Sequence, residues 1–188
     1  QPVNVPGTPL VDEPDCAPMQ APTLTPTYHI EFACGTASHA RSKLARDPQA
    51  HVIGIDIRRD WHKQVYDFIP PEHHGRFTYV HMDLTDMTIA KMAKLARDTW
   101  GIRLRQLTTC HYSPPCETYS DAHHGRSPHR VGLHPRPGPE GLKARQHDAL
   151  NGVMLNTLRE LSRTNQHTII SIEQPVCSFR HMPFTLKL

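Results

Sequence analysis

Lys and Arg are absent from the first 40 residues, and this absence divides the chain. The first residue of either type is Arg41, and the segment before it holds four of the 18 acidic residues, Asp12, Glu13, Asp15 and Glu31. The remainder carries all 21 basic side chains against 14 acidic ones. A surplus of that size is a modest indication of a polyanionic partner such as nucleic acid, and it is equally typical of a solvated basic surface.

Long apolar runs and a regular cysteine framework are missing as well. No run approaches the roughly 18 residues that a membrane-spanning helix needs, and the N-terminus lacks the basic-then-apolar pattern of a secretion signal. The five cysteines are odd in number and scattered, which is typical of reduced thiols rather than disulfides. We therefore expect no membrane partner and an intracellular, reducing compartment, the nucleus in a eukaryote and otherwise the cytoplasm.

Proline is concentrated at one end of the chain. Residues 1–27 hold seven prolines and little apolar periodicity, which predicts an extended tail or linker, whereas a folded core is expected over 28–188. The hydrophobic pattern of this core predicts strands at 28–33, 51–57, 76–84, 105–113 and 167–173. It predicts helices at 38–47, 61–69, 85–100 and 141–163. Pro70 and Pro71 should end the second helix, and Thr85 or Asp86 should cap the third.

This alternation of strands and helices predicts an α/β fold, a mostly parallel sheet with helices on both faces. Ligands of such sheets bind at the carboxyl ends of the strands. A turn of small residues, "ACGTAS", follows the first predicted strand, and Asp56 and Asp83 end the next two. Either aspartate alone is more typical of a helix cap or a solvated turn, but together with the turn they favour a nucleoside-bearing cofactor.

The stretch "SPPCETYS" (113–120) places a cysteine directly behind two prolines. Pro114 and Pro115 restrict the backbone that leads to Cys116, which suits a nucleophile presented at one angle and equally describes a rigid loop with an inert thiol. An active thiol needs cationic surroundings, for which the candidates are His111, His123, His124 and Arg126.

Glu173 leaves the last predicted strand just before a proline, in "SIEQP" (171–175). A half-buried carboxyl there can keep its proton or share it with a ring nitrogen of a substrate. The alternative is a strand-end glutamate in a salt bridge.

Together, "EFACGTAS", "SPPCETYS" and "EQP" resemble, in order and spacing, the motifs of the DNA cytosine-5 methyltransferases, and most closely their compact phage-type and algal-type members. The resemblance covers roughly residues 28–183 and implies a Rossmann-like class I methyltransferase fold. It implies that Cys116 adds to carbon 6 of cytosine and that Glu173 engages ring nitrogen 3, with the base drawn out of the DNA stack.

The resemblance also implies an S-adenosylmethionine site, with Asp56 at the ribose and Asp83 at the adenine. Its implied residues are Glu31, Phe32, Cys34, Gly35, Thr36, Asp56, Ile57, Asp83, Leu84 and Ser113. The loop 121–140, which directly follows the nucleophile, would contact DNA phosphates. The residues implied for DNA are Ser120, Arg126, Arg130 and Arg136.

Three positions depart from the family pattern. Ala37 replaces a glycine, Glu117 a glutamine and Gln174 an asparagine, and Glu117 puts a negative charge beside the thiol. The sequence given also ends soon after the fifth strand. We therefore expect the last strands, an arginine-bearing segment and a target-recognition region to come either from further segments of a longer parent chain or from a partner that completes the sheet.

Three other interpretations are weighed against this one. An amino-group DNA methyltransferase would carry an aromatic residue where Cys116 stands, and it would need no thiol. A non-catalytic nucleic-acid or cofactor-binding module would keep the fold alone. A zinc site of Cys110, His111, Cys116 and His123 matches no standard spacing, and neighbouring strand residues point to opposite faces, so no metal is expected.

Overall fold

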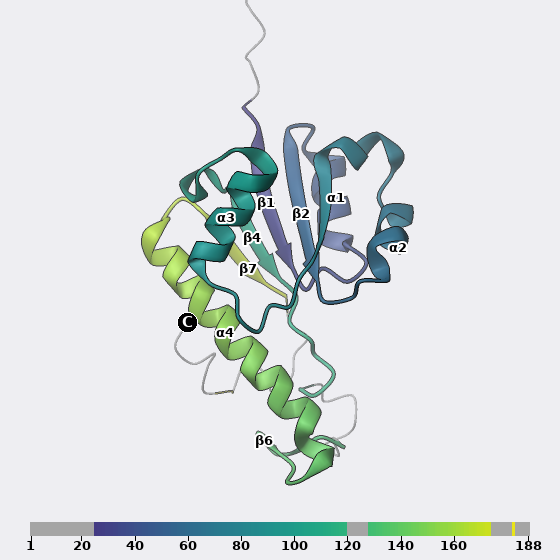
Figure 1. Ribbon diagram of the computed structural model, residues 1–188, viewed down its shortest axis with the longest axis vertical. Coiled ribbons are helices and arrows are strands. Elements are labelled where there is room, and N and C mark those ends of the chain that lie inside the picture. The colour runs from purple at the N-terminus through teal and green to yellow at the C-terminus, as the bar shows by residue number, and fades with distance from the viewer. Residues whose placement is uncertain (1–24, 120–127, 174–181, 183–188) are drawn as a thin grey trace, which may run out of the picture.

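A five-stranded parallel sheet forms the centre of the computed structural model, which describes residues 25–119, 128–173 and 182 (Figure 1). The strands are β1 (Thr27–Phe32), β2 (Ala50–Asp56), β3 (Phe77–His81), β4 (Thr109–Tyr112) and β7 (Ile169–Ile172), in the order β3-β2-β1-β4-β7. The chain builds outward from β1 to β3 and then returns to the other side of β1 with β4. The carboxyl ends of β1 and β4 therefore flank a topological switch point, where sheets of this type bind ligands.

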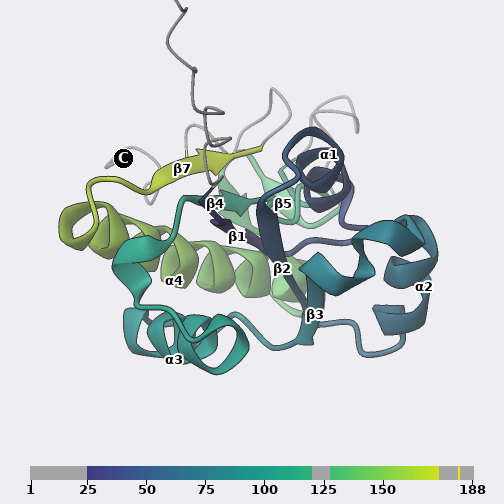
Figure 2. The same ribbon diagram turned by 90° about the horizontal axis from the view of Figure 1, so that it is seen from above.

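Helices cover both faces of the sheet (Figure 2). One face is covered by α1 (Ser38–Arg46) and α2 (Trp61–Phe68), and the other by α3 (Ile89–Trp100) and α4 (Leu142–Thr164). The expected α/β class, a parallel sheet with helices on both faces in Rossmann-like order, is thereby confirmed.

The strands present different side chains to the two helix layers because successive residues point to opposite faces. Toward α3 and α4, Ile30 and Phe32 of β1 join a large apolar cluster with Tyr112, Met154 and other core residues. A second, smaller apolar cluster lies under α1 and α2 and includes Leu44, Val52 and Phe77. The α1 side of β1 instead carries His29 and Glu31, each 1% exposed.

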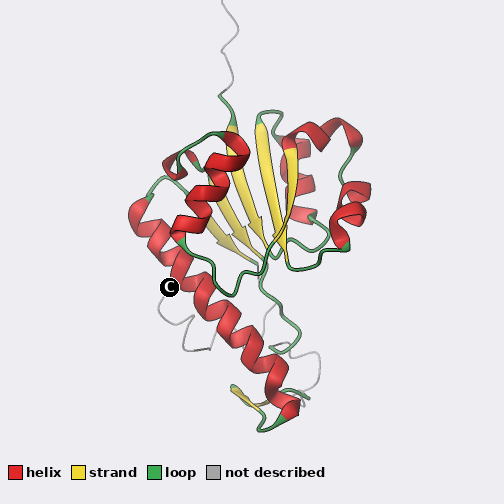
Figure 3. Ribbon diagram, in the orientation of Figure 1, coloured by secondary structure: helices red, strands yellow, loops and turns green. Residues whose placement is uncertain are grey.

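The end of α4 that begins at Leu142 extends beyond the sheet (Figures 1 and 3). Beside it lies a two-stranded antiparallel ribbon, β5 (Arg130–Val131) and β6 (His134–Pro135), which the sequence did not predict. Short 3-10 turns occupy Pro71–Arg76, Leu104–Gln106 and Pro139–Gly141.

Three expected boundaries are wrong. Strand β3 ends at His81 rather than at 84. The cap of α3 is Thr88, whose hydroxyl accepts from the Lys91 backbone N–H at 3.2 Å, while Asp86 pairs with the Lys91 side chain. Strand β4 begins at Thr109 rather than at 105, because Gln106 folds back and accepts a hydrogen bond from the Arg103 backbone N–H at 2.9 Å. The expected tail falls almost wholly outside the described residues and stays a prediction.

Candidate functional site

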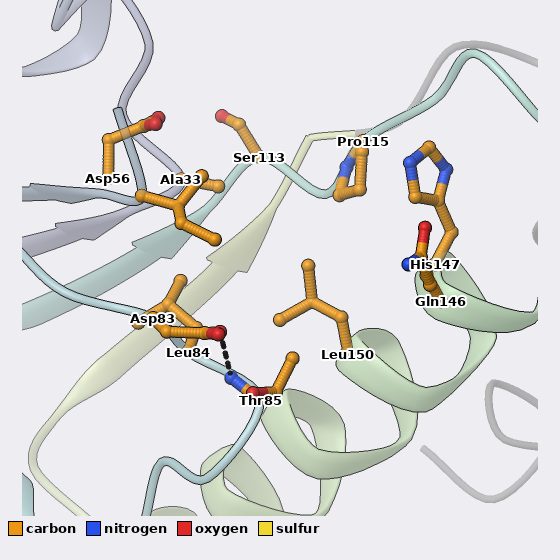
Figure 4. Close-up of a pocket in the computed structure, with 11 residues that line it drawn as sticks. Ala33, Asp56, Asp83, Leu84, Thr85, Ser113, Pro115, Gln146, His147 and Leu150 are labelled. Carbon is orange, nitrogen blue, oxygen red and sulfur yellow. Dashed lines mark hydrogen bonds between the residues drawn. The ribbon is translucent and has the colours of Figure 1, made fainter. Parts of the chain in front are cut away.

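A cavity of about 490 Å³ opens at the carboxyl edge of the sheet, between the strand ends and α4 (Figure 4). Loops after the strands supply one wall, and three residues of α4 supply the other. The lining residues are Ala33, Asp56, Ile57, Asp83, Leu84, Thr85, Ser113, Pro115, Gln146, His147 and Leu150. Its size suits a ligand as large as a nucleoside cofactor.

Half of the residues expected at the cofactor lie together in this cavity. Asp56 ends β2 and Ile57 follows it, Asp83 and Leu84 follow β3, and Ser113 follows β4. These three strand ends are far apart in sequence, and the sheet brings them to one edge.

The other expected residues, from 31 to 36, do not line the cavity. Phe32 is fully buried in the apolar cluster toward α3 and α4, so its side chain cannot contact a ligand there, and that assignment is corrected. Cys34 is packed against the second cluster, and burial raises the pKa of its thiol well above the ordinary value. Of this turn, Ala33 reaches the cavity.

The turn after β1 is held by hydrogen bonds within the protein. The Glu31 carboxylate accepts from the Ala40 backbone N–H at 2.8 Å, and burial raises the pKa of Glu31 to about 7. Gly35 has φ +51°, which glycine adopts without strain, and its N–H donates to Asp56 at 2.9 Å. Ala37, which stands where the family has a glycine, takes the same left-handed conformation at φ 56°. This costs an alanine about 1 kcal/mol or more.

Asp56 and Asp83 keep hydrogen-bonding capacity for a ligand. The two carboxylate oxygens of Asp56 accept from the backbone N–H groups of Gly35 and Arg58, at 2.9 and 3.1 Å. Asp83 accepts from the Thr85 backbone N–H at 2.9 Å, the contact drawn in Figure 4. A carboxylate offers about four acceptor positions, so both residues can still receive hydroxyl or amino hydrogens.

Cys116 lies beside the cavity on an exposed corner and is not in a disulfide. Pro115 lines the cavity directly before it, and the Tyr119 backbone N–H closes a turn onto the Cys116 carbonyl at 2.9 Å. The buried Tyr119 hydroxyl donates to Asp148 of α4 at 2.6 Å and accepts from Asn151 at 2.9 Å. The loop that presents the thiol is therefore fixed to α4.

Arg130 belongs to this fixation and is not a surface group. It is 3% exposed, its Nη2 lies 2.6 Å from Asp148 Oδ1, and its Nε donates to the Thr118 carbonyl at 2.9 Å. Its guanidinium also stacks over the Tyr119 ring at 4.3 Å. The expectation that Arg130 contacts DNA phosphates is therefore corrected. Arg136 is half-buried just after β6, and Ser120 and Arg126 lie outside the described residues.

The negative charge expected beside the thiol has a partner. Glu117 lies 2.5 Å from the Lys143 ammonium of α4, and this hydrogen bond lowers the pKa of the carboxyl. Glu117 thus remains ionised while Lys143 balances its charge.

Glu173 lies at the end of the strand next to the one that leads to Cys116. Its backbone N–H donates to the Tyr112 carbonyl at 3.0 Å, which continues the pairing of β7 with β4. Its exposed side chain places Oε2 3.5 Å from the Ser113 hydroxyl and 3.5 Å from His111 Nε2. Ser113 therefore connects Glu173 to the cavity.

Sequence reasoning missed the contribution of α4 to the cavity. Gln146 and Leu150 are four residues apart, which puts them on one face of the helix, and His147 lies next to them. Burial lowers the pKa of His147, whose Nδ1 lies 3.1 Å from the Thr118 hydroxyl. The helical spacing was visible in the sequence, but nothing in it indicated that this face meets the strand ends.

Within the described ranges, no group of three or more His, Cys, Asp or Glu side chains is arranged to hold a metal ion. Cys110 is buried toward α3 and α4, while His111 lies on the opposite face of β4, so these two cannot share a zinc ion. None of the helices in this part of the chain has the length and hydropathy required to cross a bilayer.

Comparisons with known proteins find a likeness among solved structures. No family model and no curated protein sequence matches the chain. Among solved structures, an O-methyltransferase family protein from Burkholderia thailandensis is similar over 70% of this chain, at 17% identity and a TM-score of 0.36. The chain spans 29% of the length of that protein.

Proposed function

We propose that this chain is the catalytic core of an S-adenosylmethionine-dependent methyltransferase that acts on carbon 5 of cytosine in DNA. The observation that carries the proposal is the joining of two features at one sheet edge. A nucleoside-sized cavity with Asp56 and Asp83 in its wall continues, through Ser113 and Pro115, into the loop that presents Cys116.

The residues of the cavity fit the proposed cofactor chemically. Asp56 would accept the ribose hydroxyls and Asp83 the adenine amino group, while Leu84 and Leu150 supply apolar contact for the ring. When bound, S-adenosylmethionine supplies a methyl group on a positively charged sulfur, a good electrophile.

Cys116 and Glu173 would activate the cytosine. The thiolate forms a bond to carbon 6, and Glu173 holds a proton at ring nitrogen 3, which stabilises the electron-rich ring and makes carbon 5 nucleophilic. The methyl group would pass to carbon 5 with the neutral thioether of the cofactor as the leaving group. Solvent would then accept the carbon 5 proton, the sulfur–carbon 6 bond would break, and the thiolate would be restored. Lys143 supports this role because it balances Glu117, the charge nearest the thiol in sequence.

The test measures transfer of labelled methyl groups to cytosine-containing DNA and covalent trapping on DNA with 5-fluorocytosine, whose carbon 5 cannot release a proton. We expect Cys116→Ser to abolish both while leaving cofactor binding intact, since Cys116 does not line the cavity. Cys16→Ser, in the proline-rich segment, is the matched control and should retain both activities.

Other results would identify a different function. Methyl transfer that survives Cys116→Ser would indicate an amino-group methyltransferase. A second candidate, a receptor that binds cofactor or nucleic acid without catalysis, is favoured by the exposure of both Cys116 and Glu173. Cofactor binding by the natural sequence with neither transfer nor trapping would support it.

A further inference from the structure

His111 is a buried histidine outside the cavity whose two ring nitrogens both have hydroxyl partners. It is 7% exposed, on the α1 side of β4. Its Nδ1 lies 2.8 Å from the Ser171 hydroxyl of β7, and its Nε2 lies 3.0 Å from the Ser113 hydroxyl. The His39 ring of α1 stacks on it at 3.9 Å with an interplanar angle of 6°, so the imidazole is held in one orientation.

The single hydrogen of Ser113 fixes the direction of these contacts. A serine hydroxyl donates one hydrogen bond, and Ser113 donates to Glu173 Oε2 at 3.5 Å. With the Ser113 hydrogen directed at Glu173, His111 Nε2 carries a hydrogen that it can donate to Ser113 at 3.0 Å or to Glu173 Oε2 at 3.5 Å, and Nδ1 accepts from Ser171. The contacts form one directed chain, from Ser171 through His111 and Ser113 to Glu173.

We propose that His111 is a positioning residue for Glu173, acting through Ser113. The chain holds one oxygen of the Glu173 carboxyl and stabilises the negative charge left there when its proton moves to the substrate ring. The other oxygen stays free for the base. The catalytic part of this inference rests on the function proposed above, whereas the hydrogen-bond chain does not.

The surroundings of His111 agree with this role. Glu31 is its partner in the pairing of β1 with β4, and Ser171 is its partner in β7. The two 3.5 Å separations, from Glu173 Oε2 to the Ser113 hydroxyl and to His111 Nε2, are the longest contacts of this hydrogen-bond chain. Catalytic hydrogen bonds are often long before substrate binds.

The first test reads the tautomer of His111 by long-range nitrogen–proton NMR at pH 8, in protein without ligand. We expect hydrogen on Nε2 and none on Nδ1. In Glu173→Ala, Ser113 loses its acceptor and can donate to Nε2, so the form with hydrogen on Nδ1 should become detectable. Glu72→Ala, another exposed carboxylate, is the control and should change nothing. Hydrogen on Nδ1 in the natural sequence, or no response to Glu173→Ala, would overturn the chain.

The second test compares two substitutions of His111 in the methyl-transfer assay. Gln can reproduce the Nε2 donor toward Ser113, whereas Asn reproduces only the Nδ1 position. We expect His111→Asn to lower the transfer rate about tenfold or more with cofactor affinity unchanged, and His111→Gln to stay within about threefold of the natural rate. Equal rates for the two variants would reduce His111 to a structural role.

His29 offers a matched control, because it lies on the same face and also bonds two hydroxyls, those of Thr27 and Thr109. The Thr27 hydroxyl donates to Asp47 at 2.7 Å, so this second chain ends at a carboxylate outside the cavity. The same pair of substitutions at His29 should leave the transfer rate unchanged. If the natural sequence neither transfers methyl groups nor is trapped, the proposed function fails, while the tautomer measurement still decides whether the chain exists.

Discussion

The two faces of β1, β4 and β7 carry different kinds of side chain. Toward α3 and α4 the strands present Ile30, Phe32, Cys110, Tyr112, Ile170 and Ile172. Toward the α1 side the same strands present His29, Glu31, Thr109, His111, Ser171 and the exposed Ile169. One face is a continuous apolar core, and the other consists of hydrogen-bonding side chains apart from Ile169.

One face of the sheet therefore contributes mainly to stability, and the other carries the polar side chains of the proposed chemistry. The apolar face gains free energy from buried area, while a buried polar face must satisfy each donor and acceptor to avoid a penalty. No buried side-chain nitrogen or oxygen of the described residues lacks a partner. His29, Glu31 and His111 of this face can therefore be buried, whereas Ser171 at the edge of the face is exposed. The same face carries the hydrogen-bond chain that ends at Glu173.

The largest expected effect is on the apolar face. Phe32→Ala should lower the free energy of unfolding by about 3–5 kcal/mol, because it leaves a cavity between the sheet and the helices. Urea denaturation measures the loss. Phe68→Ala on α2, where the ring is 49% exposed, is the control and should change stability by no more than about 0.5 kcal/mol. If Phe32→Ala lowered the free energy of unfolding by less than about 1 kcal/mol, the placement of Phe32 in the apolar core would be contradicted.

The polar face should make stability depend on pH, in two opposing ways. Burial raises the pKa of Glu31 to about 7, so its contribution is complete below pH 4.5 and is lost as the pH rises through 7. Burial lowers the pKa of His29 to about 4, so its contribution is complete above pH 6.5 and is lost as the pH falls toward 4. Each effect amounts to roughly 3 kcal/mol.

Substitution of each group should isolate its own contribution to the pH dependence of stability. Relative to the natural sequence, Glu31→Gln should become more stable as the pH rises from 4.5 to 7, and His29→Gln more stable as it falls from 6.5 to 4. Urea denaturation across pH 4–8 gives both difference curves, in which groups common to all variants cancel. Flat difference curves would show that this face does not bury titratable groups as described.

The smallest effect compares neighbouring residues of β7. Ile169 is 66% exposed on the polar side, so Ile169→Thr should change stability by no more than about 0.5 kcal/mol. Ile170 packs against the apolar cluster, and Ile170→Thr should cost about 1–2 kcal/mol. Thermal or urea unfolding measures the pair, and equal losses would mean that the two faces of this edge strand do not differ.

Much of the site was accessible from sequence because strand ends follow from local patterns. Asp56, Asp83 and Ser113 end or follow apolar runs, and parallel strands bring such ends to one edge, as the cavity confirms. The expected ligand turn was less accurate, since Phe32 belongs to the core rather than to the cavity. Sequence position places a residue near a site, but alternation decides the side to which it points.

The sequence by itself determined the order of strands and helices, the α/β class and the strand ends that line the cavity, because hydrophobic periodicity is a local property. Only the tertiary structure decided that Arg130 is buried against Asp148 and that α4 closes the cavity. It also decided that Ser171 and Ser113 are both partners of His111, since Ser171 lies 60 residues away in sequence. A partner that distant is set by packing between elements, which no local pattern reports.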